Sequence, residues 1–252
     1  VTEAVLNALI LTDHDAALGQ LSRPTQDALA QMWSTQLTTG PEAGSWPWID
    51  FQREPWEARD SNYFGAVLAA LAIERTPAAY RARPDIQPAL ARLRTYLISA
   101  YAHEPLLNRI DLLWASARWP ELMTPAARTA LLSEIWAHQR QDGGWNLPSL
   151  MPAWHRRDGT PQASGSDGYA TGLVTLALQL CEESPGGVSA GDPRLQRGLR
   201  WLRNHQGLWS GGWTTASPNH RFRLIHRHYD ITRHFMDDAA TAYAVLSLRQ
   251  AT

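Results

Sequence analysis

The chain has 252 residues and a formal net charge of −1, from 23 basic and 24 acidic residues. This length suits one large domain or two small ones, and such a balanced charge gives no whole-chain attraction to nucleic acid or to an anionic membrane. All the basic residues are arginine, which excludes a Schiff base or a lysine nucleophile. The single cysteine, Cys181, cannot form an internal disulfide, and no apolar run reaches the roughly 18 residues that a membrane-spanning helix needs.

Hydrophobic periodicity predicts helices along most of the chain and no strand. Apolar residues recur at spacings of three and four in nine segments, with proline and glycine between them. The segments are residues 3–12, 25–36, 62–73, 86–100, 106–117, 126–139, 169–181, 193–206 and 239–248. Segments that are apolar on every side alternate with segments that carry an arginine stripe. This alternation predicts helical hairpins, each with one inner and one outer helix.

The predicted inner helices repeat in sequence. The stretches "DSNYFGAVLAAL", "DGYATGLVTLAL" and "DDAATAYAVLSL" align without gaps, with a leading aspartate and a small residue five positions later. The aspartates are Asp60, Asp167 and Asp237, and the small residues are Gly65, Gly172 and Ala242. Repeated hairpins predict an all-α fold, an α/α toroid with inner and outer helix rings, formed as a single domain by residues 1–252. Because helical periodicity is already present at Val1, we expect an N-terminal segment of the full-length protein to precede it.

One stretch carries a family resemblance. The sequence "RGLRWLRNHQGLWSGGW", residues 197–213, resembles the glutamine–tryptophan repeat of squalene–hopene and oxidosqualene cyclases. Partial copies occur at Gln139–Gly143–Trp145 and at Gln36–Gly44–Trp46. The resemblance implies the toroid of triterpene cyclases and protein prenyltransferase subunits, in which the glutamine closes an outer helix and the tryptophan stacks on it. We therefore expect Gln206 to bond the last carbonyls of its helix and Trp213 to be buried.

The leading aspartates are the first candidates for a functional site. Inner helices of a toroid begin near one end of the central cavity, so Asp60, Asp167 and the pair Asp237–Asp238 are expected around one mouth. The alternative is that these aspartates cap the amides at the start of their own helices. A single cap needs only one carboxylate, so the pair Asp237–Asp238 favours a functional role more than the other two.

The resemblance extends to the catalytic motif of class II terpene cyclases, Asp-any-Asp-Asp-Thr-Ala, in which the middle aspartate protonates a polyene. The chain reads "FMDDAATA", with Phe235 in place of the first aspartate and Ala239 in place of the threonine. The match implies that Asp237 is the acid and Asp238 its neighbour. His234 is close enough in sequence to be a hydrogen-bonding partner of the acid.

Aromatic and arginine residues could complete this site. Trp114, Tyr63, Tyr169 and Tyr243 lie on predicted inner helices, where their rings could line a cavity and stabilise a cation. Arg233 closes a long arginine- and histidine-rich loop that could hold a diphosphate, although these arginines could equally pair with the helix-start aspartates and solvent. The histidine spacing matches no standard metal site, and the zinc ligands of protein prenyltransferases have no counterpart. We predict neither a metal nor another cofactor.

Three functions remain open at this stage. The first is a cyclase or isomerase that acts on a hydrophobic polyprenoid or lipid, with Asp237 as the acid. The second is a non-catalytic toroid that binds a lipid or serves as a subunit of a larger complex. The third is a carbohydrate-active toroid with two carboxylates. Phrases such as "EPWEARDSNYFGA" and "SDGYATGL" also resemble uncharacterised bacterial squalene-cyclase-like proteins, and this likeness favours a periplasmic or secreted location.

Overall fold

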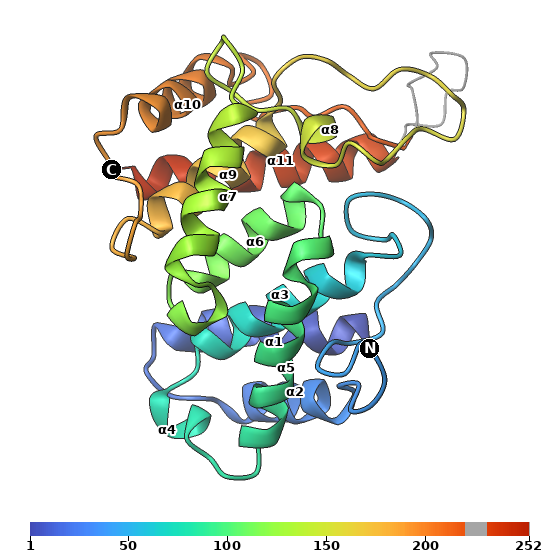
Figure 1. The fold of residues 1–252 in the computed structure, drawn as a ribbon, viewed down its shortest axis with the longest axis vertical. Helices are drawn as coiled ribbons and strands as arrows, with labels where there is room; N and C mark the ends of the chain where they lie inside the picture. Colours follow the sequence, from blue (N-terminus) through green and yellow to red (C-terminus); the bar gives the residue numbers. More distant parts are fainter. Residues whose placement is uncertain (220–230, 252) are drawn as a thin grey trace. The chain divides into compact units, whose positions relative to one another are not determined.

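The computed structural model describes the backbone of residues 1–219 and 231–251, and their side chains except those of residues 231–234. Within this part of the chain the fold is all-α, as predicted, with no β-strand (Figure 1). All nine predicted segments are helical, and two short helices, α4 and α8, were not anticipated. No helix among the described residues is long and apolar enough to cross a membrane.

The chain divides into two compact units, one formed by residues 1–104 and 118–123 and the other by residues 105–117 and 124–252. The helices of the first unit are α1 (Thr2–Ala16), α2 (Arg23–Ser34), α3 (Ser61–Glu74), α4 (Ala78–Arg81) and α5 (Gln87–Ala100), with the short 3-10 helices η1 (Tyr101–His103) and η2 (Pro120–Leu122). Those of the second unit are α6 (Leu106–Ser116), α7 (Pro125–Ala137), α8 (Leu147–Leu150), α9 (Gly168–Leu180), α10 (Pro193–Asn204) and α11 (Ile231–Gln250).

Each unit is built around one helix that is buried on all sides. In the first unit this helix is α3, which packs against α1 and α5; in the second it is α9, which packs against α11, α6, α10 and α8. The arginine-striped α10 instead buries one face only, through residues that include Leu195, Leu199 and Leu202. The all-apolar segments 62–73 and 169–181 therefore form central helices, whereas the all-apolar segment 239–248 lies in α11, where Val245 (42%) and Leu246 (44%) are exposed.

The two glycines of the inner-helix repeat are sites of close approach, whereas its third small residue, Ala242, is exposed. A Cβ atom added to Gly172 would lie 2.7 Å from the backbone nitrogen of Ala244 and 2.8 Å from the carbonyl carbon of Tyr243, so α9 and α11 touch along their backbones there. At Gly65 an added Cβ would lie 2.2 Å from the ring of Trp48. The two glycines thus mark positions where a side chain would separate packed elements.

Three turns, which we call the Gln–Trp turns, end helices α2, α7 and α10 with the same pair of hydrogen bonds. Each tryptophan Nε1 donates to a carbonyl in the last turns of the preceding helix, and each glutamine Nε2 donates to the carbonyl of the glycine two residues before the tryptophan. The tryptophan bonds are Trp46 to Met32 (2.7 Å), Trp145 to Ile135 (2.9 Å) and Trp213 to Leu202 (2.8 Å). The glutamine bonds are Gln36 to Gly44 (3.1 Å), Gln139 to Gly143 (2.9 Å) and Gln206 to Gly211 (2.6 Å).

This geometry corrects one detail of the sequence expectation. Trp213 is buried as predicted, with 3% of its surface exposed. The helix carbonyl, however, is bonded by the indole of Trp213 and not by Gln206, whose amide bonds the glycine of its own turn. The tryptophan reaches back because the glycine turn returns the chain over the end of the helix, where carbonyls lack intrahelical partners.

The Arg-Gly pair at the start of the repeat contacts the preceding turn. The Nη2 atom of Arg197 donates to Oε1 of Gln139 (2.9 Å), and a Cβ on Gly198 would lie 2.8 Å from the ring of Trp145. The first unit holds an equivalent contact between Arg92 Nε and Gln36 Oε1, at 3.3 Å. Each of these two turns is therefore fastened to the next peripheral helix along the chain, α5 or α10.

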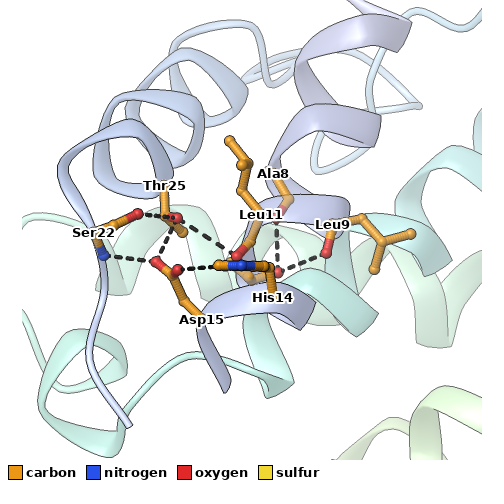
Figure 2. A network of polar contacts seen from close by, with 8 residues as sticks. Ala8, Leu9, Leu11, His14, Asp15, Ser22 and Thr25 are labelled. Carbon is orange, nitrogen blue, oxygen red and sulfur yellow. Dashed lines mark hydrogen bonds and ion pairs between the residues drawn. The ribbon is translucent and has the colours of Figure 1, made fainter. Parts of the chain in front are cut away.

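A buried carboxylate joins α1 to α2 in the first unit (Figure 2). Asp15 Oδ2 accepts hydrogen bonds from the backbone nitrogen of Ser22 (2.6 Å) and the hydroxyl of Thr25 (2.5 Å), and Oδ1 lies 3.1 Å from His14 Nδ1. These donors, led by Thr25, lower the pKa of Asp15 below its usual value. Asp15 shows how this fold treats a structural carboxylate, since donors surround it.

Candidate functional site

Asp60 lies in the first unit, at the N-cap position of α3, but it does not cap the helix. Its side chain accepts no capping hydrogen bond and instead forms a side-chain hydrogen bond with Glu54. Burial raises the pKa of Glu54 to about 8, and the charge and hydrogen bond of Asp60, together with the charge of Glu104, add to the effect. The carboxyl group of Glu54 therefore keeps its proton at neutral pH.

Asp167, in the second unit, is a fully bonded helix cap. Its Oδ1 accepts from the backbone nitrogen of Ala170 (2.9 Å) and the hydroxyl of Thr215 (3.1 Å), and its Oδ2 accepts from the backbone nitrogen of Leu147 (2.6 Å). Burial raises its pKa to about 6, and these bonds oppose the rise. With its acceptors used in this way, Asp167 fits the capping alternative.

Asp237 does not begin its helix, which corrects the sequence expectation. Among the described residues α11 spans Ile231–Gln250, and residues 231–236 contain no proline or glycine, so Asp237 lies inside the helix. Asp237 Oδ1 accepts from the backbone nitrogen of Thr215 (3.0 Å), and Asp238 is exposed. The side chains of His234 and Arg233, and the rest of the loop at 220–230, lie outside the described residues.

Of the four aromatic candidates, Tyr63 lies in the core of the first unit. Its hydroxyl donates to the carbonyl of Leu97 in α5 (2.9 Å), and its ring centroid is 5.9 Å from that of Tyr96. Tyr63 is fully buried. These contacts join α3 to α5, which is a packing role.

The other three aromatic candidates lie together in the second unit. The ring of Tyr243 in α11 meets the ring of Trp114 in α6 edge to face, with centroids 6.3 Å apart, and meets the ring of Tyr169 in α9 at 5.1 Å. Tyr169 also forms a side-chain hydrogen bond with Tyr243. Tyr169 is fully buried, whereas Trp114 and Tyr243 are partly exposed. We call these three residues the aromatic cluster.

Asp111, which sequence reasoning missed, belongs to the same region. It precedes Trp114 by three residues on α6, so the two side chains share a face of that helix. Only 2% of its surface is exposed, and its Oδ2 atom is buried without a hydrogen-bond partner among the described residues. Its charge also acts on Tyr243. The available signal was an acidic residue inside the apolar run "RIDLLW".

The electrostatics of this region follow from burial. Burial alone raises the pKa of Asp111 to about 8, so its carboxyl group is protonated at neutral pH. Burial also raises the pKa of Tyr243, and the negative charge that Asp111 would carry adds to this rise. A neutral carboxyl group inside a protein can donate a hydrogen bond or a proton to a ligand that reaches it. Together with the aromatic cluster, Asp111 forms the candidate site.

Neither a metal site nor a related sequence defines the chemistry of the candidate site further. Among the described residues, no group of three or more His, Cys, Asp or Glu side chains is placed to hold a metal ion. A separate cavity of about 560 Å³ lies at the second Gln–Trp turn and is lined by residues 137–142 and Ser149. No protein-family model matches the chain, and no curated protein matches it.

Proposed function

We propose that this chain is a squalene-cyclase-like α/α toroid that binds a polyprenoid or related lipid at the aromatic cluster of its second unit. The observation that carries the proposal is the buried carboxyl group of Asp111 with an unpartnered oxygen, on the same helix face as Trp114. The partly exposed rings of Trp114 and Tyr243 offer apolar contact area, and the carboxyl group offers one polar anchor. Mostly apolar surroundings with few polar groups are typical of small-molecule sites.

The toroid is supported by the repeated plan of the chain. The three Gln–Trp turns share their hydrogen bonds, and buried helices alternate with peripheral ones within each unit. These features agree with the resemblance to squalene–hopene cyclases. Under this proposal the inner ring consists of α1, α3, α6, α9 and α11.

Asp111 suits hydrogen bonding to the ligand better than protonation of a double bond. A carboxyl group with a pKa of about 8 keeps its proton at neutral pH, and for the same reason it is a weak acid, whereas an alkene needs a strong one. Asp237 accepts a backbone hydrogen bond from Thr215, so one of its carboxyl oxygens is already engaged within the chain. We therefore favour binding, or proton transfer to a ligand oxygen, over polyene cyclisation.

The test is to incubate the protein with squalene and shorter prenyl compounds and to analyse bound and converted material by mass spectrometry. We expect a prenyl compound to bind to the wild type and to Asp237→Asn, and to bind more weakly to Asp111→Asn. Conversion that disappears in Asp237→Asn would instead support the cyclase mechanism implied by the resemblance. If no prenyl compound or other lipid binds, the proposed function is wrong.

One observation favours the second role, that of a subunit in a larger complex. In the third Gln–Trp turn Leu208 and Trp209 are 95% and 101% exposed, and Gln206 bonds only the glycine of its own turn. The glutamines of the other turns also bond a carbonyl of the next peripheral helix, Ala89 and Arg194 respectively. A helix of a partner protein that offers a backbone carbonyl to Gln206, as α5 and α10 do to the other two glutamines, would cover this surface. Sedimentation of the wild type and of Trp209→Ala would detect the association.

A further inference from the structure

The acceptor atoms of Asp111 set it apart from the other buried aspartates. Asp15 and Asp167 each accept hydrogen bonds from backbone nitrogens and hydroxyls. Asp111 Oδ2 has no donor among the described residues. Because buried polar atoms in native proteins are nearly always bonded, this atom is open to a partner that the described residues do not supply.

Among the described residues no arginine pairs with Asp111, and the buried Arg128 of the neighbouring helix α7 instead donates to the carbonyl of Pro185 (3.1 Å) and to Ser116 Oγ (3.4 Å). The short helix α8 and the central helix α9, which pack beside α6, contain no charged residue. The nearest arginine in sequence, Arg109, is engaged by Glu134 of α7 through two hydrogen bonds of 2.7 and 2.6 Å. On α11 the described charged residues are Asp237, Asp238 and Arg249, and Asp237 is bonded to Thr215. Burial is the one recognised cause of the raised pKa of Asp111.

These features favour a positively charged ligand over a negatively charged one. Among the described residues, an anion would meet a carboxyl group and the electron-rich faces of Tyr and Trp rings. A cation would be attracted both by the ring faces and by the ionised form of Asp111. We propose that the second unit binds an organic cation, a protonated amine with an apolar chain, whose ammonium group donates to Asp111 Oδ2 beside the rings of Trp114 and Tyr243. This inference rests on the proposed function, because the apolar chain uses the same aromatic cluster.

Binding has a defined proton balance. At neutral pH the carboxyl group of Asp111 holds a proton, which passes to solvent when the ammonium ion takes its place beside the carboxylate. One ion pair forms and one proton is released for each amine bound. Since Oδ2 is fully covered, a neighbouring side chain must move for the amine to arrive, and the partly exposed rings of Trp114 and Tyr243 are the ones placed to do so.

The test compares two probes that differ only in the head group, geranylamine and geraniol, by titration calorimetry at pH 7. The wild type should bind geranylamine at least ~10-fold more tightly than geraniol, as expected for a buried charged hydrogen bond. Titrations in two buffers of different ionisation enthalpy should show release of about one proton per amine, as the balance above requires. Asp111→Asn, an exchange of equal size, should lose both the preference and the proton release.

Asp238→Asn is the matched control, because it removes an exposed carboxylate from the same unit. This variant should keep the preference for the amine. That result would show that the preference depends on Asp111 and not on a general attraction of amines to acidic residues. Equal binding of both probes to the wild type would leave the proposed function standing and overturn the cation inference. An amine preference that persists in Asp111→Asn would overturn it as well, and failure of both probes to bind would overturn the inference together with the proposed function.

Discussion

The buried carboxyl group of Asp111 should cost the protein stability in a pH-dependent way, and Asp111→Asn should reveal it. The pKa is 3.8 for an ordinary aspartate and about 8 for Asp111 in the folded chain. Between these values the folded state holds a proton that the unfolded state has lost, so stability falls as pH rises. The slope for one group is about 1.4 kcal/mol per pH unit. Asn has no such proton, so the variant escapes this loss.

From pH 5 to pH 7 the free energy of unfolding of Asp111→Asn should therefore rise relative to that of the wild type by about 2–3 kcal/mol. The assay is guanidinium unfolding followed by circular dichroism at pH 5, 6 and 7, with the wild type measured alongside at each pH so that all other titrating groups cancel. Asp167→Asn provides the contrast. Its carboxylate accepts three hydrogen bonds, so this variant should be less stable than the wild type at pH 7.

A stability difference between Asp111→Asn and the wild type that does not change from pH 5 to pH 7 would refute this reasoning, since it would mean that Asp111 titrates normally. A marked loss of stability in Asp111→Asn at pH 7 would do the same, because it would reveal a carboxylate with donors. A variant that is more stable than the wild type yet fails to bind ligand is the signature of a group retained for function.

Three further predictions concern two close glycine contacts and one tryptophan hydrogen bond. Gly172→Ala should lower the free energy of unfolding by about 1–3 kcal/mol, because its Cβ meets the backbone of α11, and it should weaken ligand binding by displacing Tyr243. The control is Gly65→Ala, measured by the same melting and binding assays, which should destabilise the protein without affecting binding. Gly198→Ala should loosen the contact of α10 with Trp145, seen as faster hydrogen exchange in α10, and unchanged exchange would contradict it. Trp145→Phe removes the donor to a buried helix carbonyl and should cost about 1–3 kcal/mol in denaturant melts; a melt that matches the wild type would show that water replaces the indole.

Periodicity predicted the helices because each has a strong and simple pattern. All-apolar segments such as 62–73 and 169–181 had to be buried, and their central positions in the two units follow directly. The start of α11 was misplaced because the polar residues before Asp237 break the apolar pattern without breaking the helix. Among the described residues, α11 already includes the eight residues before 239.

The site was only half predictable. Trp114, Tyr169 and Tyr243 could be chosen because ring type and inner-helix position were both visible in the sequence, and the structure brings these three together. Asp111 could not be identified as a site residue from the sequence alone, because an aspartate in an apolar run can equally be a paired or a capping residue. Its lack of a donor among the described residues depends on how the helices pack, which no spacing along one helix reveals.

The Arg-Gly contact with the preceding turn has a consequence for recombination between related chains. The segment that ends in Trp145 is completed by Arg197 and Gly198, more than fifty residues later. A crossover placed in the loop before α9, where a hairpin boundary appears natural, would part this turn from the residues that hold it. A chimera joined beyond Gly198 would inherit the pair of Arg197 and Gly198 intact. The segment that can be exchanged is therefore offset by roughly one hairpin from the segment that a boundary in the loop before α9 would define.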